Sequence, residues 1–212
     1  MYYSFTKRLF DLFFSVIALI LLLPLLVFTG LLIKLGSKGP AIFKQERLGK
    51  DMKPFIIFKF RTMGSGSETH GIITLNKDPR ITRVGKYLRK TKLDELPQLI
   101  NVVKGDMSLV GPRPKPKEYI ALYKKEEKAL LSFKPGITSP ASIKYSREEE
   151  LMTDDISTAR SQYCSLLPKK LAYDLEYFGH PSLSGDVMII LRTIGLVFSA
   201  AVSSIFPKLR QK

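Results

Sequence analysis

An uncharged apolar run of 22 residues, from Leu12 to Ile33, constrains this chain more than any other feature of its sequence. A helix that rises about 1.5 Å per residue would be about 33 Å long over this run, enough to cross a hydrocarbon core of about 30 Å. The run therefore predicts a helix in contact with lipid. We expect a membrane segment over residues 1–35, followed by a chain rich in charge.

Three arrangements of this segment are open: a cleaved signal peptide, a spanning helix, and a re-entrant helix that bends and returns to the same face. A signal peptide is disfavoured because the run is long and lacks a small-residue cleavage site. Pro24, in the middle of the run, has no N–H for the carbonyl of Ile20 and predicts a kink. Spanning helices also tolerate proline, so the kink does not exclude a span.

Positive charges flank both ends of the apolar run. They are Lys7 and Arg8 before it, and Lys34, Lys38, Lys44 and Arg47 after it. Basic residues favour the cytoplasmic side of a membrane, so a span would misplace one set, whereas a re-entrant helix places both correctly. The charges thus favour the re-entrant arrangement. An unpaired carboxylate at this depth is costly, so we expect Asp11 to pair with Lys7 or Arg8.

Turn residues divide the rest of the chain into short elements. Two strands are expected within residues 41–62, bracketed by Gly39-Pro40, Gly49 and Pro54. Helices are expected from about Thr82 and over residues 96–104, with Pro97 in the first turn and Gly105 past the end. Further elements are a flexible loop at 64–71, an amphipathic helix at 114–133, and helices at 147–160, 166–178 and 187–206, the last interfacial or packed.

The formal net charge is 34 − 19 = +15, which predicts an anionic partner such as lipid headgroups, a phosphorylated substrate or nucleic acid. Within this basic chain, Asp94 and Glu95 form an adjacent pair of carboxylates just before Pro97. Such a pair suits Mg²⁺ shared with substrate phosphates, and a carboxylate can also attack phosphorus. The structural alternative is a capping box formed by Thr91 and Asp94.

Arg113 lies between Pro112 and Pro114, which hold its backbone extended. A guanidinium fixed in this way suits bidentate binding of phosphate. The alternative is a solvent-facing arginine in a rigid loop. Other basic residues that suit phosphate contacts are Lys59, Arg61, Arg80, Arg83 and Arg89.

Several segments together resemble the small monotopic phosphoglycosyl transferases, the bacterial sugar transferase family that begins glycan assembly on a polyprenyl phosphate. The resemblance covers nearly the whole chain, and the 90–114 block is the part most specific to the family. The segments are KRLFD (7–11), the Pro-containing apolar run, IKLGSKGPAIFKQERLGK (33–50), KPFIIFKFRTM (53–63), KTKLDELPQLINVVKGDMSLVGPRP (90–114), KPGIT (134–138) and KLAYDLEYF with the later Asp186.

The resemblance implies a reaction and a set of roles. Asp94 would attack the diphosphate of a UDP-sugar, release UMP and pass the phosphosugar to polyprenyl (undecaprenyl) phosphate. Glu95 would complete a dyad with Asp94 that works with Mg²⁺. The remaining roles are substrate binding for Lys59, Arg61, Arg89, Pro112, Arg113 and Pro114, and membrane anchoring for Lys7, Arg8, Asp11 and Pro24.

The expected fold is α+β. It comprises a Pro-kinked re-entrant membrane helix (1–35), a mainly helical catalytic domain with a small β-sheet and interfacial amphipathic helices (36–185), and an apolar interfacial helix with a basic tail (186–212). The resemblance implies a monotopic protein among the lipids of the inner (plasma) membrane with its domain on the cytoplasmic face. No nucleic-acid partner is expected, and a homodimer is compatible with the sequence.

The sequence departs from the family at two places. Leu23 replaces a serine found in many members before the kinking proline, which removes a hydroxyl but keeps the effect of Pro24. Residues 139–150 follow a different branch, and the sequence does not identify the sugar. The alternative function is a non-catalytic, membrane-anchored basic module that binds anionic lipid or nucleic acid. Asp94 and Glu95 argue against it, because they would repel phosphates unless a metal intervened.

Overall fold

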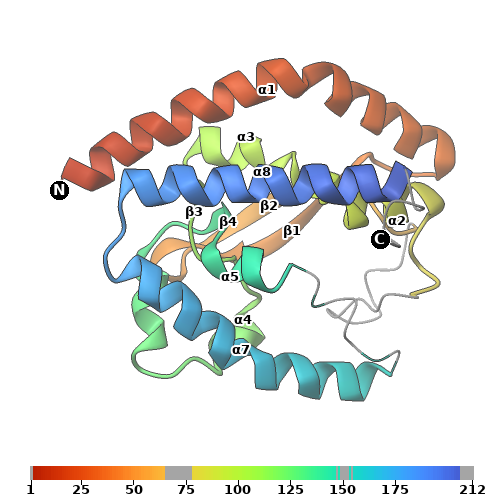
Figure 1. Ribbon diagram of the computed structural model, residues 1–212. Helices are drawn as coiled ribbons and strands as arrows, with labels where there is room; N and C mark the ends of the chain where they lie inside the picture. Colours follow the sequence, from red (N-terminus) through yellow and green to blue (C-terminus); the bar gives the residue numbers. More distant parts are fainter. Residues whose placement is uncertain (1, 65–77, 147, 149–152, 154, 206–212) are drawn as a thin grey trace.

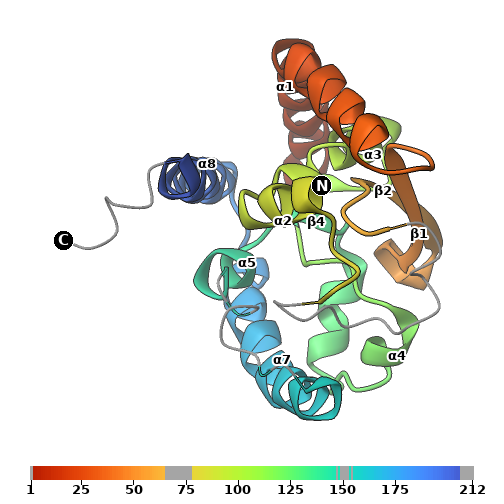
Figure 2. The same ribbon diagram turned by 90° about the vertical axis from the view of Figure 1, so that its right-hand side faces the viewer.

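The computed structural model describes residues 2–64, 78–146, 148, 153 and 155–205, and it combines helices with two small sheets (Figures 1 and 2). Short 3₁₀ turns carry the label η. In chain order the elements are α1 (Tyr2–Gly36), β1 (Ile42–Leu48), η1 (Lys50–Met52), β2 (Pro54–Phe60), α2 (Arg83–Lys90), η3 (Leu93–Glu95), α3 (Gln98–Lys104), β3 (Ser108–Val110), α4 (Lys117–Ile120), η4 (Glu127–Ser132), β4 (Gly136–Thr138), α5 (Pro140–Lys144), α7 (Ile156–Phe178) and α8 (Leu183–Ile205).

The two strands predicted within residues 41–62 are confirmed. β1 and β2 form an antiparallel hairpin in which Ile42 lies opposite Phe60. Ile57 and Phe60 are buried, Ile57 with Val102 of α3 and Phe60 with Ile33 of α1. The hairpin is thus fixed by the helices on either side of it.

The second sheet is a parallel pair, β3 and β4, which the sequence did not predict. Gly111, just after β3, lies so close to Gly136 of β4 that a Cβ atom on Gly136 would be 2.0 Å from the Gly111 nitrogen. Gly111 N–H donates to the Thr138 carbonyl and Gly136 N–H to the Pro112 carbonyl, each at 3.0 Å. These contacts fix the backbone that leads into Arg113.

The prediction of a single helix over residues 114–133 is wrong. The segment forms the short helix α4, a turn and then η4. Pro116 has extended backbone before α4, and the Glu127 carboxylate accepts a hydrogen bond at 2.7 Å from the Lys124 backbone N–H, which closes a turn instead of a helix. Tyr119, Tyr123 and Leu130 nevertheless lie in the largest hydrophobic cluster, as their shared face predicted.

The helix predicted at 166–178 is confirmed, but the break predicted before it is wrong, because residues 156–178 form one continuous helix. The helix at 166–178 begins earlier, as α7 at Ile156, with the Asp155 side chain accepting from the Thr158 N–H at 2.8 Å. Two predicted segments lie largely outside the described residues: the part of the 147–160 helix before Ile156, and the 64–71 loop after Gly64. The predicted C-terminal helix is present as α8, and it is long and apolar enough to cross a membrane. Its interfacial or packed placement stays a prediction.

Helix α1 contains Pro24 and is one continuous helix, with the length and composition of a membrane span. Figure 1 shows it bowed along one side of the molecule. Its N-terminal part contacts α3 and β3, and its C-terminal part contacts α2 through the buried Ile33, which packs on Phe60 and Leu88. Both parts of α1 therefore lie against the same domain.

The two faces of α1 differ in polarity. The side chains that are buried against the domain include Asp11, Ser15 and Thr29. Large apolar side chains on the other faces of the helix are exposed, including Ile20 at 66 % and Leu21 at 72 %. A surface helix of a water-soluble protein has the opposite arrangement, with apolar side chains buried and polar side chains exposed. The arrangement in α1 suits a helix whose outer face contacts lipid.

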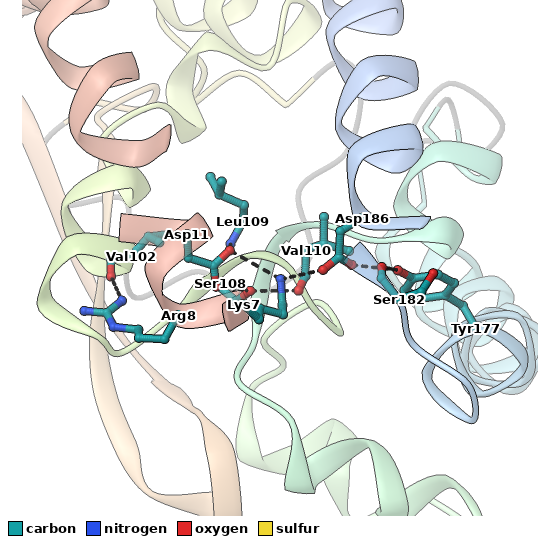
Figure 3. A network of polar contacts seen from close by, with 10 residues as sticks. All are labelled: Lys7, Arg8, Asp11, Val102, Ser108, Leu109, Val110, Tyr177, Ser182 and Asp186. Atoms are coloured by element: carbon teal, nitrogen blue, oxygen red, sulfur yellow. Dashed lines mark hydrogen bonds and ion pairs between the residues drawn. The ribbon is translucent and has the colours of Figure 1, made fainter. Parts of the chain in front are cut away.

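A polar network ties the start of α1 to four other elements (Figure 3). The Arg8 guanidinium donates to the carbonyls of Val102 and Val103 at 2.6 and 2.9 Å. The Asp11 carboxylate accepts from Ser108 Oγ at 2.8 Å and lies 3.3 Å from Lys7 Nζ, so its predicted pairing is confirmed.

Lys7 also pairs with Asp186 of α8, at 2.9 Å, and Asp186 accepts from the Tyr177 hydroxyl at 2.7 Å (Figure 3). The charged residues predicted to anchor the helix in the membrane thus bind the protein itself. They connect α1 with α3, β3, α7 and α8.

Candidate active site

Asp94 and Glu95 lie side by side in η3, between α2 and α3, and both are buried. The chain enters η3 through Lys92, which has a left-handed backbone (φ 57°). Thr91 and Asp94 do not form the capping box that the sequence left open. The Thr91 hydroxyl donates instead to the carbonyls of Tyr87 (2.9 Å) and Leu88 (3.2 Å) in the preceding turn. Thr91 therefore ends α2 and leaves Asp94 available.

Glu95 is held by two cations. Lys59 Nζ lies 3.0 Å from Glu95 Oε1, and the Arg113 guanidinium binds both carboxylate oxygens, with Nη1 3.2 Å from Oε2. Burial alone would raise the pKa of Glu95, but the charges of Arg113 and Lys59 outweigh it and hold that pKa well below its usual range. Glu95 is therefore a fixed carboxylate that joins β2 to the Pro112–Pro114 segment.

Asp94 has a different environment. Its Oδ1 atom is buried and has no hydrogen-bond partner within the described residues. Burial and the neighbouring Glu95 raise the pKa of Asp94 to about 6, against the opposite effect of Lys59, Arg89 and Lys92. The group is still mainly a carboxylate at pH 7, and it has an oxygen without a hydrogen-bond partner in basic surroundings.

Asn101 positions this site and was not predicted from the sequence. Its side chain is fully buried on α3, donates to the Ile56 carbonyl at 2.7 Å and accepts from the Phe58 N–H at 3.0 Å. These bonds hold β2 against α3 and so place Lys59 beside Glu95. The available signal was an asparagine inside a short helix, where this residue is intrinsically unfavourable.

The other predicted binding residues divide into two groups. Arg89, in the last turn of α2, acts electrostatically on Asp94. Arg61 is buried at the end of α1, where its Nη2 donates to the Ser37 carbonyl and hydroxyl at 2.9 Å each. The structure thus brings Lys59, Arg89 and Arg113 around the carboxylates and places Arg61 at the C-terminal end of the membrane helix.

The site has a limited set of potential metal ligands. No group of three or more His, Cys, Asp or Glu side chains occurs among the residues that the structure describes. The orphaned Asp94 oxygen and its neighbour fit Mg²⁺, which commonly takes one or two carboxylates and completes its shell with water and substrate phosphates. They do not form a self-contained cage.

Comparison with known sequences assigns the chain to a family. A sequence profile described as "Bacterial sugar transferase" matches residues 2–200. The chain belongs to the bacterial sugar transferase family. The match includes α1, the carboxylate pair, the Pro112–Pro114 segment and most of α8.

Three relatives illustrate the range of the family. The exopolysaccharide production protein PSS of Rhizobium leguminosarum bv. phaseoli is 41 % identical over 89 % of this chain and 92 % of its own length. An Aeromonas hydrophila UDP-N-acetylgalactosamine-undecaprenyl-phosphate N-acetylgalactosaminephosphotransferase is 38 % identical over 93 % of this chain. The UDP-glucose:undecaprenyl-phosphate glucose-1-phosphate transferase of Escherichia coli (strain K12) is 39 % identical over 92 %.

The chain corresponds to a part of the longer relatives. It spans 44 % of the Aeromonas protein and 41 % of the Escherichia coli protein. The names of these two relatives refer to different sugars, so family membership alone does not assign a sugar to this chain.

Proposed function

We propose that this protein transfers a sugar 1-phosphate from a UDP-sugar to undecaprenyl phosphate and releases UMP. The observation that carries the proposal is the division of roles between two adjacent buried carboxylates. Glu95 is bound by Lys59 and Arg113, whereas Asp94 retains an oxygen without a partner. One carboxylate is therefore structural and electrostatic, and the other is available to react.

The proposed reaction has two steps. An Asp94 oxygen attacks the sugar-bearing phosphorus of the donor, the bond from phosphorus to the bridging oxygen breaks, and UMP leaves with that electron pair. A phosphate oxygen of undecaprenyl phosphate then attacks the same phosphorus, and the bond to Asp94 breaks. A covalent intermediate divides one transfer into two, so the two bulky substrates need not bind together.

The cations around the dyad support this chemistry. Arg113 and Lys59 fix Glu95, and together with Arg89 they provide a positive surface for the diphosphate. Mg²⁺ bound by Asp94 or Glu95 would neutralise charge on the diphosphate and on the leaving UMP. The proposal includes the predicted Mg²⁺ requirement for this reason.

UMP release is the direct test. Detergent-purified protein would be assayed with Mg²⁺, undecaprenyl phosphate and a panel of UDP-sugars, with EDTA as the metal-free control. We expect release with at least one donor and its loss in EDTA. No release with any donor, from protein shown to be folded, would contradict the proposal; binding to anionic vesicles under the same conditions would then favour the non-catalytic module.

We further propose that α1 is re-entrant and that the protein is monotopic on the cytoplasmic face of the inner membrane. Helix α1 is about 52 Å long, far more than a span needs. Contacts at both ends of α1 with one domain support this, since a span would place one end across the bilayer. The apolar outer face and Pro24 are compatible with a helix that dips into lipid.

Cysteine labelling tests this topology. In a Cys164→Ser background we would place single cysteines at two exposed positions, Ser4→Cys and Lys34→Cys, with Lys128→Cys as a marker of the domain. We expect an impermeant maleimide to label all three in inside-out vesicles and none in intact cells. Labelling of the Ser4 position only from outside would establish a span.

A further inference from the structure

The inner face of the β1–β2 hairpin carries a second cation besides Lys59. Lys59 lies opposite Phe43, and Arg47 follows Phe43 by four positions on the same strand, so Arg47 and Lys59 lie on one face of the hairpin. Along β1 the alternate residues Lys44 and Glu46 are exposed, whereas Arg47 is partly buried. Arg47 is therefore directed toward the domain, on the same side as Lys59.

The end of β1 adjoins the segment that carries Arg113. The two residues after Arg47 line the same small cavity as Pro112 and Arg113. Burial and the positive charge of Arg113 lower the pKa of Arg47, which nevertheless stays charged at any physiological pH. The charges that act on Arg47 include Arg113 but neither carboxylate of the dyad. The basic groups thus extend from the dyad through Arg113 to Arg47.

Arg47 has no ion pair within the described part of the chain, whereas Lys59 and Arg113 both bind Glu95. Its Nη1 atom donates to the adjacent Glu46 carbonyl at 3.0 Å, and Glu118 attracts it electrostatically without forming an ion pair. A guanidinium has several N–H donors, so most of those on Arg47 remain for a ligand. Two neighbouring guanidiniums also repel each other, and an anion that binds both removes this repulsion.

The UDP-sugar of the proposed reaction carries negative charge on only one side of its reacting phosphorus. That phosphorus must lie at Asp94, and a neutral sugar follows it on one side. On the other side follows the second phosphate, which leaves as part of UMP. A cation that has no acid partner and lies beyond Arg113 from the dyad therefore suits the nucleotide side of the substrate, because the sugar side offers it no charge.

We propose that Arg47 is a further substrate-binding residue, which together with Arg113 binds the nucleotide-side phosphate of the UDP-sugar and stabilises UMP as it leaves. The inference rests on the proposed function, because it concerns the substrate of that reaction. Arg47 donates hydrogen bonds in this role and transfers no proton. It acts in the first step alone, since UMP is absent when undecaprenyl phosphate attacks.

The two steps can be measured separately, which tests this role. Protein incubated with UDP-sugar and Mg²⁺ would form the Asp94 adduct, and undecaprenyl phosphate added after removal of the nucleotide would discharge it. We expect Arg47→Met to reduce kcat/KM for adduct formation about tenfold, as for the loss of a hydrogen bond between charged groups. Arg47→Lys should retain part of the rate. Discharge of the adduct should proceed at the wild-type rate in both variants.

Lys44→Met is the matched control, because Lys44 is an exposed cation on the outer face of the same strand. It should leave both steps unchanged. An equal slowing of both steps by Arg47→Met would mean that Arg47 maintains the fold of the site, and it would overturn the inference.

Binding of UMP gives a readout that does not depend on turnover. Calorimetry with Mg²⁺ would compare UMP with uridine in the wild type and in Arg47→Met. We expect the substitution to weaken UMP binding about tenfold and to leave uridine binding unchanged, because uridine has no phosphate. This result without any adduct would support the role of Arg47 while the proposed reaction failed. An unchanged affinity for UMP in Arg47→Met, or no UMP binding by the wild type, would overturn the inference, and adduct formation by the wild type would then preserve the reaction.

Discussion

Asp94→Asn should abolish UMP release, by at least about 10³-fold in kcat, while the protein remains folded. The substitution keeps the size of the side chain but replaces the attacking oxygen with an amide that is not nucleophilic. Because the Asp94 Oδ1 atom has no partner within the described residues, its removal breaks no hydrogen bond seen there. Burial and the neighbouring Glu95 raise the pKa of Asp94, so neutralisation should stabilise the fold or leave it unchanged.

The measurement combines UMP release with intact-mass spectrometry. Wild-type protein incubated with UDP-sugar and Mg²⁺, without the lipid acceptor, should gain the mass of one phosphosugar, and Asp94→Asn should not. Glu95→Gln is the matched comparison: it should reduce the rate and also lower the melting temperature, because it removes the ion pairs of Glu95 with Lys59 and Arg113. If the Asp94→Asn variant still formed a phosphosugar adduct, the nucleophile would have to be another residue.

The local features of this site were accessible from the sequence because they depend on neighbouring residues. The Gly and Pro signals predicted the β1–β2 hairpin and the ends of α3, and adjacent carboxylates between basic segments identified the dyad. The charge pattern around α1 likewise predicted that Asp11 pairs with Lys7. In each case the interacting residues are a few positions apart.

Features that depend on long-range packing were not accessible. The amphipathic pattern over residues 114–133 predicted a helix, but Glu127 closes a local turn and the apolar side chains reach the same core from α4 and η4. Nothing in the sequence paired β3 with β4, which fixes the backbone before Arg113. The roles of Asn101 and Asp186 likewise rest on partners far along the chain.

Asp186→Asn should lower the stability of the protein by about 3 kcal/mol, the cost expected when one partner of a buried ion pair is removed. Asp186 is fully buried, and it binds Lys7 of α1 and the Tyr177 hydroxyl of α7. Its neutralisation leaves the Lys7 ammonium, which is largely buried, with Asp11 as its anionic partner within the described residues. For a chain of this length the melting temperature should fall by about 6–12 °C.

A double-mutant cycle with Lys7→Met separates this pair from general damage. If Lys7 and Asp186 join α1 to α8, the double variant should be more stable than the sum of the single losses predicts, by about 1–3 kcal/mol. Lys104→Met is the control, because the Lys104–Asp106 pair is 3.7 Å long and exposed, and its loss should cost less than about 1 kcal/mol. Additive losses in the cycle would mean that Asp186 stabilises α8 through contacts other than Lys7, such as Tyr177, and that Arg8 and Asp11 suffice to hold the membrane helix on the domain.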